Sequence, residues 1–556
     1  MWFKKKTLQT RVVRFDTRDR STRRVYRVVG YVALVVHAVS LLSTPLWVYP
    51  DSIDYIRLAG GIASRANFAD DLFLIRPPGY PMMLAIVFKF FGQASPVVIQ
   101  ILQHAMGVGL ALLTVALSLR VSSRRSVALV AGIFCSLSLQ VLSYCNMPLT
   151  EVPFTLAFLG ATYFLVRYWQ LPSGKTLMCW SACAGVAYMI KPIGVMLFGI
   201  AAIAVGVRIW CRLRSDAKAA GQPFVHAARL FVGHCGTTAG VAMIPLLLIV
   251  APWVVYRTGG HSSSATASCL DYVLYLRPLE FDRLDISTTK SMAMLDIRSV
   301  VAEASSRGLV PPEADYRDRL TAIHAYQRLR GLSFSQGTKI LGRAGLDVML
   351  EHPRLTLLNT IKYAVWMLLS PDPVYRFVPG GAPGVDGQRD QAAEFYGIST
   401  YSHGPGSWEK TLQEQASFLP LSSRPRLATR SWKAMVSAFR SHIDRRRWSL
   451  GIGDSLYEMF VLFCLSGAVL FVWRYRDGPA LILLLTFAFY IGISAFFGGS
   501  QTRYVVVVKP LLCLWTGFSA VVFFDAIAFF YGGHVAARKG SPDVPISRSP
   551  RSTSTS

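Results

Sequence analysis

The sequence predicts an all-α protein that crosses a membrane many times. Of its 556 residues 52% are hydrophobic, and the mean hydropathy is +0.39, which is more than a soluble fold needs. Many apolar runs approach the roughly 20 residues with which a helix spans a bilayer. We therefore expect about ten or eleven transmembrane helices, with interfacial helices in the first extracytoplasmic loop and a long extracytoplasmic loop later in the chain.

The net charge of +27 is explained better by a membrane than by nucleic acid. The basic residues cluster between apolar runs, where the positive-inside rule and anionic lipid account for them. No nucleic-acid-binding motif accompanies them, so we expect membrane lipid and no nucleic acid among the partners. The cysteines lie mostly in or beside apolar runs, which favours packing over a disulfide framework or a zinc site.

Charge and hydropathy divide the chain into five parts. These are a basic cytoplasmic N-terminus, a transmembrane core, a set of extracytoplasmic loops with a small subdomain, further transmembrane helices and a disordered tail, at 1–27, 28–257, 258–454, 455–531 and 532–556. The core contains a first loop at 48–96, which the basic N-terminus places outside the cell membrane. Within the third part, 355–369 is either a span or an interfacial segment, and the two alternatives differ in where they place the basic stretch 371–454.

The first loop combines two carboxylates with a stiff basic turn. Asp51 and Asp54 are three residues apart, so a helix starting at Ser52 places both in its first turn, where the helix dipole favours the ionised form. In the RPPGYP run, prolines and a glycine fix the backbone that presents Arg76 and Tyr80. A carboxylate held charged at a membrane surface can serve as a base.

The order PDSxxY, a short acidic gap and RPPGYP resembles the first extracytoplasmic loop of the GT-C membrane glycosyltransferases. The similarity is to the branch that contains protein O-mannosyltransferases and lipid A aminoarabinose transferases. Further motifs of that branch follow in order, at Thr150-Glu151, Lys191-Pro192, PWVVYR ending at Arg257, and Arg503-Tyr504. The resemblance implies a GT-C-type helical bundle and a sugar donor carried on polyprenyl phosphate, with a glycan, lipid or protein as acceptor.

The resemblance also implies roles for the acidic residues. Asp51 aligns with the aspartate that relatives have at this point and would be the base. Asp54 either raises the proton affinity of Asp51 by repulsion or caps the helix. Glu151 would line the active site, since an acid that begins a membrane helix is costly unless it faces a cavity or a partner. The alternative for Glu151 is a charge that complements the helix dipole.

Four cations are candidates for binding the phosphate: Arg76, Lys191, Arg257 and Arg503. Lys191 stands where relatives commonly have arginine and lacks its forked geometry. Arg257 comes one residue later than in the family's PWxxRN motif, and an ordinary interfacial anchor is its alternative role. Tyr55 and Tyr80 either orient the donor or belong to the aromatic belt.

We expect no required cofactor and no dedicated metal ligands. A divalent cation held by Asp51 and Glu151 stays open, although no dense cluster of oxygen ligands demands one. His37 and His104 lie in apolar runs, where packed and hydrogen-bonded histidines are more common than ligands.

The predicted function is that of an inverting glycosyltransferase in the cell (inner) membrane with an extracytoplasmic active site. A flippase for lipid-linked sugars is the alternative from another class, but it needs charged groups deep along a path through the bilayer. An O-antigen ligase or polymerase is a third possibility, and it would not predict acidic residues that open the first loop.

Overall fold

The computed structural model describes residues 19–43, 50–66, 68, 73, 76–92, 96–122, 124–220, 224–258, 271, 274–282, 284, 286, 289–312, 315–317, 319–369, 450–475, 478–498 and 505–538. Every regular element in these ranges is helical, in agreement with the predicted all-α class. The basic stretch 371–454 lies almost entirely outside the described residues.

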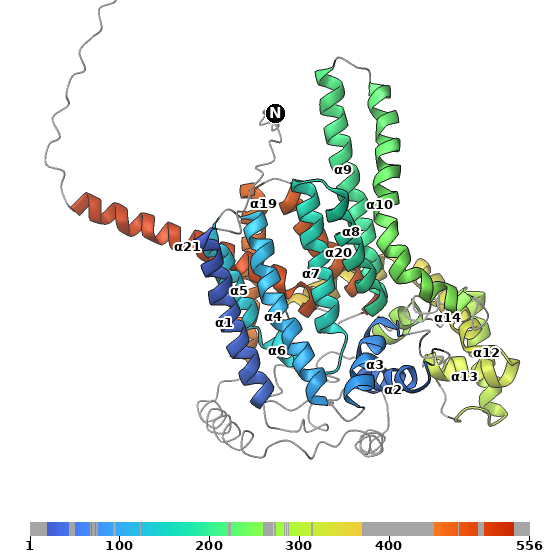
Figure 1. Cartoon of the computed structure of the whole chain (residues 1–556). Coiled ribbons are helices and arrows are strands. Elements are labelled where there is room, and N and C mark those ends of the chain that lie inside the picture. Colours follow the sequence, from blue (N-terminus) through green and yellow to red (C-terminus); the bar gives the residue numbers. More distant parts are fainter. Residues whose placement is uncertain are drawn as a thin grey trace, which may run out of the picture.

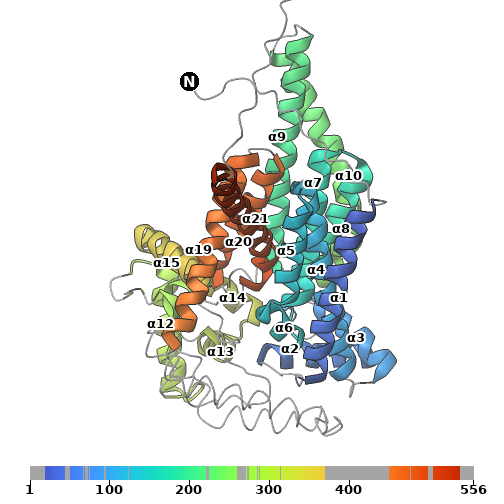
Figure 2. The same cartoon turned by 90° about the vertical axis from the view of Figure 1, so that its left-hand side faces the viewer.

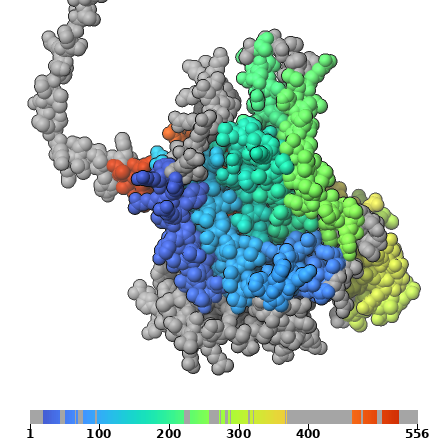
Figure 3. All heavy atoms as spheres, viewed as in Figure 1, coloured from blue at the N-terminus to red at the C-terminus, as the bar shows by residue number. Residues whose placement is uncertain are grey.

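The N-terminal half forms a bundle with two short helices at one end (Figure 1). Its elements are α1 (Arg20–Ser43), α2 (Pro50–Arg65), α3 (Gly79–Phe91), α4 (Pro96–Val121), α5 (Arg125–Ser136), α6 (Leu139–Cys145), α7 (Glu151–Gln170), α8 (Gly174–Ile190), the 3-10 turn η2 (Pro192–Val195), α9 (Met196–Ala219) and α10 (Phe224–Thr258). Helix α4 contacts α1, α5 and α7 and thereby joins them. Helices α9 and α10 pair and project past the other helices at the end away from α2 and α3 (Figures 1 and 3).

The C-terminal half adds a small helical unit and three long helices. Its elements are the π-helical turn η3 (Arg277–Phe281), α12 (Met292–Ser306), α13 (Arg319–Arg330), α14 (Phe334–Glu351), α15 (Pro353–Leu369), α19 (Leu450–Tyr475), α20 (Gly478–Gly498) and α21 (Val505–Arg538). Helix α21 packs on α5 and α19, which closes the side of the bundle that Figure 2 brings into view.

Six of the described helices are long and apolar enough to cross a membrane. Helices α5 and α6, bent by 48° at a short break, would make a seventh span together. This is fewer than the ten or eleven expected. The other core helices are short or less apolar: α8 and α15 have 17 residues each, and α7 carries a charge in both its first and its last turn. Helices α7 and α8 nevertheless pack lengthwise against the spans.

The bundle end away from α2 and α3 is basic. The start of α1, the end of α4, the start of α5 and the end of α7 all lie there and carry arginines. Ion pairs join these ends, since Arg125 binds Asp19 just before α1, and Arg124 binds Asp525 in α21. The first loop and the basic turns thus lie at opposite ends, as the charge pattern predicted.

Residues 275–348 have a hydrophobic core of their own, separate from that of the bundle. Arg277 joins this unit to the bundle. Its fully buried side chain pairs with Asp282 at 3.0 Å, donates to the carbonyl of Ala495 in α20 and lies over the ring of Tyr363 in α15. Helix α15, the segment with two alternative placements, packs against α20 and α19 and exposes leucines on its outer face.

Candidate active site

The first loop docks on the bundle through α2 and α3. Pro50 takes the first position of α2, where its missing N–H costs nothing. The rings of Tyr55 and Tyr80, both buried, meet edge to face with centroids 5.1 Å apart. Helix α3 begins at Gly79 against the end of α8, where a Cβ at this glycine would lie 2.6 Å from the carbonyl oxygen of Met189. These contacts hold the backbone of the RPPGYP turn against α2 and the end of α8.

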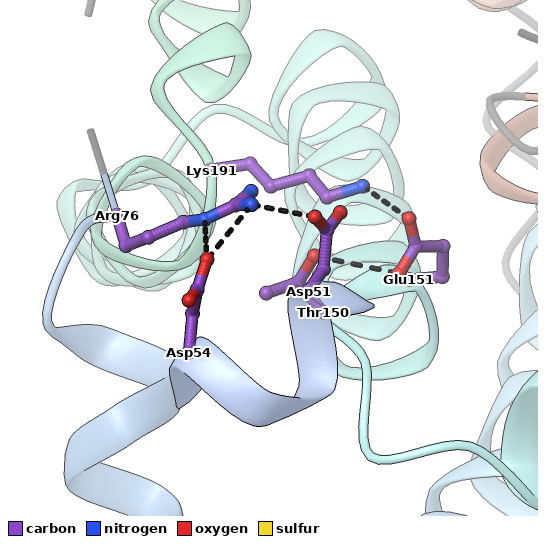
Figure 4. A network of polar contacts seen from close by, with 6 residues as sticks. All are labelled: Asp51, Asp54, Arg76, Thr150, Glu151 and Lys191. Atoms are coloured by element: carbon purple, nitrogen blue, oxygen red, sulfur yellow. Dashed lines mark hydrogen bonds and ion pairs between the residues drawn. The ribbon is translucent and has the colours of Figure 1, made fainter. Parts of the chain in front are cut away.

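Arg76 reaches back from this turn to both carboxylates of α2 (Figure 4). Its Nη2 lies 2.5 Å from Asp51 Oδ1 and 3.3 Å from Asp54 Oδ2. The guanidinium also lies over the ring of Tyr55, 5.4 Å from its centroid. The three charged side chains are each only a fifth to a third exposed, so the cluster is half-buried.

A second ion pair joins the start of α7 to the break after α8. Lys191 Nζ lies 2.8 Å from Glu151 Oε1, and the glutamate is only 2% exposed. Pro192 ends α8 and leaves Lys191 in an extended conformation, which points its amine across to α7. Glu151 is the first residue of α7, where the helix dipole favours its charge.

The two ion pairs belong to one site. In Figure 4 the side chain of Lys191 extends from near the guanidinium of Arg76 toward Glu151, and the carboxylate of Asp51 lies between the two basic groups. Tyr55 adjoins both pairs: the guanidinium of Arg76 lies over its ring, and its hydroxyl forms a hydrogen bond with Thr150, the residue before Glu151. The structure thus brings together seven of the nine predicted site residues, namely Asp51, Asp54, Tyr55, Arg76, Tyr80, Glu151 and Lys191.

Burial governs proton affinity at this site. It raises the pKa of Asp54 above its ordinary value even though the Arg76 cation opposes the shift. It also raises the pKa of Tyr55 to about 12 and that of Tyr80 well above its usual range. Both tyrosines are therefore neutral hydrogen-bonding groups at physiological pH.

The remaining two predicted residues are not described to the same extent. Arg257 lies in the last turn of α10, with its side chain outside the described residues, and Arg503 is outside them altogether. An aromatic cluster still brings the end of α10 to the first loop. The ring of Trp253 lies 5.5 Å from that of Phe73, and the ring of Tyr256 lies 5.5 Å from that of Phe68.

Two further residues support the site and were absent from the predicted set. Gln103 of α4 donates from Nε2 to the hydroxyl of Tyr80 at 2.7 Å and to the carbonyl of Leu149 at 3.4 Å. Thr150 bonds both Tyr55 and Glu151. A glutamine inside an apolar span is the sequence signal that could have identified Gln103, since a buried amide needs partners.

The acids of the site outnumber its described cations. Asp51, Asp54 and Glu151 supply three carboxylates, while Arg76 and Lys191 supply two cations. Carboxylate oxygens are ligands for hard divalent cations, but here each carboxylate already contacts a basic side chain. An anionic ligand that drew one of the two cations toward itself would release a carboxylate for proton transfer.

One family model matches part of the chain. Residues 75–232 match the family model described as dolichyl-phosphate-mannose-protein mannosyltransferase. The matched segment contains Arg76, Tyr80, Glu151 and Lys191, while Asp51 and Asp54 precede it. A search of curated proteins finds no match.

Solved structures of two transferases are similar to this chain at low identity. The archaeal oligosaccharyltransferase AglB from Archaeoglobus fulgidus, in complex with an inhibitory peptide and a dolichol-phosphate, is 12% identical with a TM-score of 0.41, over 94% of this chain and 52% of that one. ArnT from Cupriavidus metallidurans bound to undecaprenyl phosphate is 14% identical with a TM-score of 0.33, over 88% and 77%. The chain thus spans about half the length of the AglB chain.

Fold and site together define a polytopic membrane protein with acids and cations gathered at one end of its helical bundle. The family match over residues 75–232 agrees with the resemblance of the loop motifs to the GT-C membrane glycosyltransferases.

Proposed function

We propose that the protein is an inverting glycosyltransferase that moves a sugar from a polyprenyl-phosphate carrier to an extracytoplasmic glycan, lipid or protein. The main support for the proposal is that two groups of ion pairs lie next to each other. Arg76 pairs with Asp51 and Asp54, and Lys191 pairs with Glu151. Transfer from a lipid phosphate needs a base for the acceptor and a cation for the leaving phosphate, and this cluster offers both within one site.

In the proposed step, the donor phosphate binds Arg76 and Lys191. It replaces some of the ion pairs that these two side chains form with carboxylates. Arginine suits this exchange because its planar fork pairs with phosphate as well as with carboxylate. Asp51, released from Arg76, then accepts the proton of the acceptor as its oxygen or nitrogen attacks the anomeric carbon. The bond from sugar to phosphate breaks on the opposite side, so a single displacement inverts the anomeric configuration.

Tyr55, Tyr80 and Glu151 would act by positioning. The two tyrosines are neutral, and they frame the guanidinium of Arg76. Glu151 holds Lys191 toward the site. Arg257 is proposed as a further phosphate contact because the aromatic cluster brings the end of α10 to the first loop, and Arg503 is proposed on its motif alone.

The lipid tail would lie along α10. This helix exposes apolar side chains over its outer half, among them Leu247, Leu248 and Val255, and it ends at the aromatic cluster beside the first loop. An isoprenoid chain on this surface would bring its phosphate toward Arg76. The lysines and arginines at the opposite end support an orientation in the cell (inner) membrane with the site outside.

The direct test is sugar transfer from undecaprenyl-phosphate-linked donors in proteoliposomes. We expect Asp51→Asn to lower turnover by at least about 10²-fold with donor binding retained, because a positioned base contributes that much. Glu151→Gln should also lower turnover. Asp216→Asn, an exposed carboxylate on α9 far from the site, is the matched control and should leave it unchanged.

Other outcomes would contradict specific parts of the proposal. Movement of the lipid-linked sugar between leaflets without cleavage would establish a flippase instead of a transferase. A product with the anomeric configuration of the donor would exclude the single displacement. The proposed step uses no metal, so EDTA should leave turnover unchanged; lost activity that Mg²⁺ or Mn²⁺ restores would assign Asp51 and Glu151 to a cation instead.

A further inference from the structure

A second cluster of reactive side chains lies inside the bundle, where the proposed transfer does not use it. His37 of α1, His104 of α4 and Cys145 at the end of α6 are all buried. One ligand atom from each lies within 4.8 Å of the others. Within the described residues no other group of histidines, cysteines and carboxylates gathers its ligand atoms in this way.

The hydrogen bonds around His104 fix which of its nitrogens is available. Asn146 donates from Nδ2 to the carbonyl of Leu142 at 2.9 Å and to Ser40 Oγ at 3.0 Å, so its Oδ1 must be the acceptor. His104 Nε2 lies 3.0 Å from that Oδ1 and therefore carries the proton. The lone pair of His104 is then on Nδ1, which faces His37 Nδ1 at 2.9 Å. A metal-binding histidine commonly has its other N–H held by an amide or carboxylate oxygen in this manner.

The space for the cluster is provided by a glycine. Gly107 lies one turn after His104 on α4, and a Cβ there would lie 2.9 Å from both Cys145 Sγ and His37 Nδ1. Any larger residue would therefore displace the ring and the sulfur.

We propose that His37, His104 and Cys145 bind a monovalent copper ion. Two imidazoles and a thiolate are the ligands that soft and borderline metals prefer. Coordination at the usual lengths of about 2.0 Å to nitrogen and 2.3 Å to sulfur in a three-coordinate site would need the two Nδ1 atoms about half an ångström further apart than they are.

Charge and ligand number favour Cu⁺ over Zn²⁺. With two neutral imidazoles and one thiolate, Cu⁺ gives a neutral site, whereas Zn²⁺ leaves a net positive charge buried in an apolar bundle, which is costly. Structural zinc sites are almost always four-coordinate, and this group has three ligands. Binding transfers no electron. The thiol of Cys145 donates to the carbonyl of Gln103 at 3.4 Å; the ion displaces this thiol proton, which leaves to solvent. The proton between the two Nδ1 atoms moves to His37 Nε2.

The ion would stabilise the bundle directly behind the candidate active site. It would join α1, α4 and α6 through single coordination bonds. On α4 the preceding residue, Gln103, donates to the hydroxyl of Tyr80. The copper site does not depend on the proposed sugar transfer, since none of its ligands belongs to the acid and cation cluster.

The test is a titration of the purified full-length chain with Cu⁺ under anaerobic, reducing conditions, in competition with a chromophoric Cu⁺ chelator. We expect the wild type to bind one equivalent. Cys145→Ser and His104→Gln should each weaken binding by at least about 10-fold, the scale seen when metal-site contacts are lost. Cys464→Ser and His352→Gln, a buried cysteine and a histidine elsewhere in the chain, should bind as the wild type does.

X-ray absorption of the loaded wild type provides a measurement that needs no variant. We expect one sulfur and two nitrogen scatterers around copper. A copper ion without a sulfur neighbour, a wild type that binds no copper, or a Cys145→Ser variant that binds as tightly would each overturn the proposal. A parallel titration with Zn²⁺ that fills the same three ligands while Cu⁺ does not would overturn the choice of copper.

Discussion

Lys191 and Glu151 form the most buried ion pair of the candidate site, and their separation should be costly. The carboxylate is 2% and the amine 12% exposed, so removal of one partner leaves a charge that water cannot reach. We expect Lys191→Met to lower the free energy of unfolding by roughly 3 kcal/mol, the scale for a broken buried pair. Reversible unfolding in SDS measures the change.

Two further variants distinguish the effect of breaking the ion pair from the effect of losing the lysine side chain itself. Glu151→Gln combined with Lys191→Met should recover part of the lost stability, because no buried charge is then left unpaired. Asp525→Asn breaks the exposed pair with Arg124, whose side chains are 56% and 47% exposed, and should cost less than about 1 kcal/mol. Equal effects of the buried and the exposed change would contradict the assigned burial.

Asp54 should determine how the site responds to acid. Burial raises its pKa above the ordinary aspartate value of 3.8 and Arg76 opposes the shift, so the folded protein holds this proton at a pH where the unfolded chain has released it. Asp54 therefore contributes stability at low pH that is lost as pH rises through the raised pKa. Its protonation also removes one of the two carboxylates that hold Arg76.

We therefore expect kcat/KM to fall on the acid side with a midpoint above that of an ordinary aspartate. Asp54→Asn should remove this limb of the pH profile. Arg76→Gln should move the limb to higher pH, since the cation that lowers the pKa of Asp54 is lost. If the fall in kcat/KM at acid pH keeps the same midpoint in both variants, it is caused by a group other than Asp54.

The sequence was informative about the charged residues and much less so about their neutral supports. Asp51, Arg76, Glu151 and Lys191 could be predicted because a charge beside a membrane segment is conspicuous and because their motifs occur in a known order. The roles of Gln103 and Thr150 were harder to predict, since hydrogen bonds between distant helices depend on how those helices pack. His37 and His104 were predicted to be packed and hydrogen-bonded, and Cys145 completes their group only through the bend between α5 and α6.

Among the elements, α3 depends most closely on a single residue. Gly79 begins this helix where the end of α8 leaves no room for a side chain, since a Cβ at this position would lie 2.6 Å and 2.7 Å from backbone atoms of Met189. We expect Gly79→Ala to push α3 away from α8 and to move Arg76 and Tyr80 with it. Stability should fall by about 1–3 kcal/mol, as for other overpacked sites, and donor KM should rise.

Gly199→Ala provides the matched control, because no atom of the described residues lies within 4 Å of a Cβ at this position in α9. It should leave stability and KM unchanged or slightly improved, since alanine favours a helix over glycine. A Gly79→Ala variant as active and as stable as this control would mean that α3 is not fixed against α8 in the way described.

At the scale of the elements, helix type was easier to predict than helix number. Apolar runs such as 97–121 and 505–528 are long enough to identify as spans from hydropathy alone. Helices α7 and α8 are shorter or more polar, and their packing against neighbouring helices places them in the bundle. The separate core of 275–348 also could not be read from the sequence in detail, because its helices are amphipathic over short lengths.

For the whole molecule, the separation of charge between the two ends predicts its orientation in the membrane. Ser64 is exposed near the end of α2 on the candidate site's side, and Cys211 is exposed near the end of α9 on the opposite, basic side. In a background without other cysteines, Ser64→Cys should react with a membrane-impermeant thiol reagent in intact cells. The native Cys211, kept alone in a second variant, should react only after the membrane is permeabilised, because basic ends stay in the cytoplasm. The reverse pattern would place the acids and cations of the first loop inside the cell, where an extracytoplasmic acceptor could not reach Asp51.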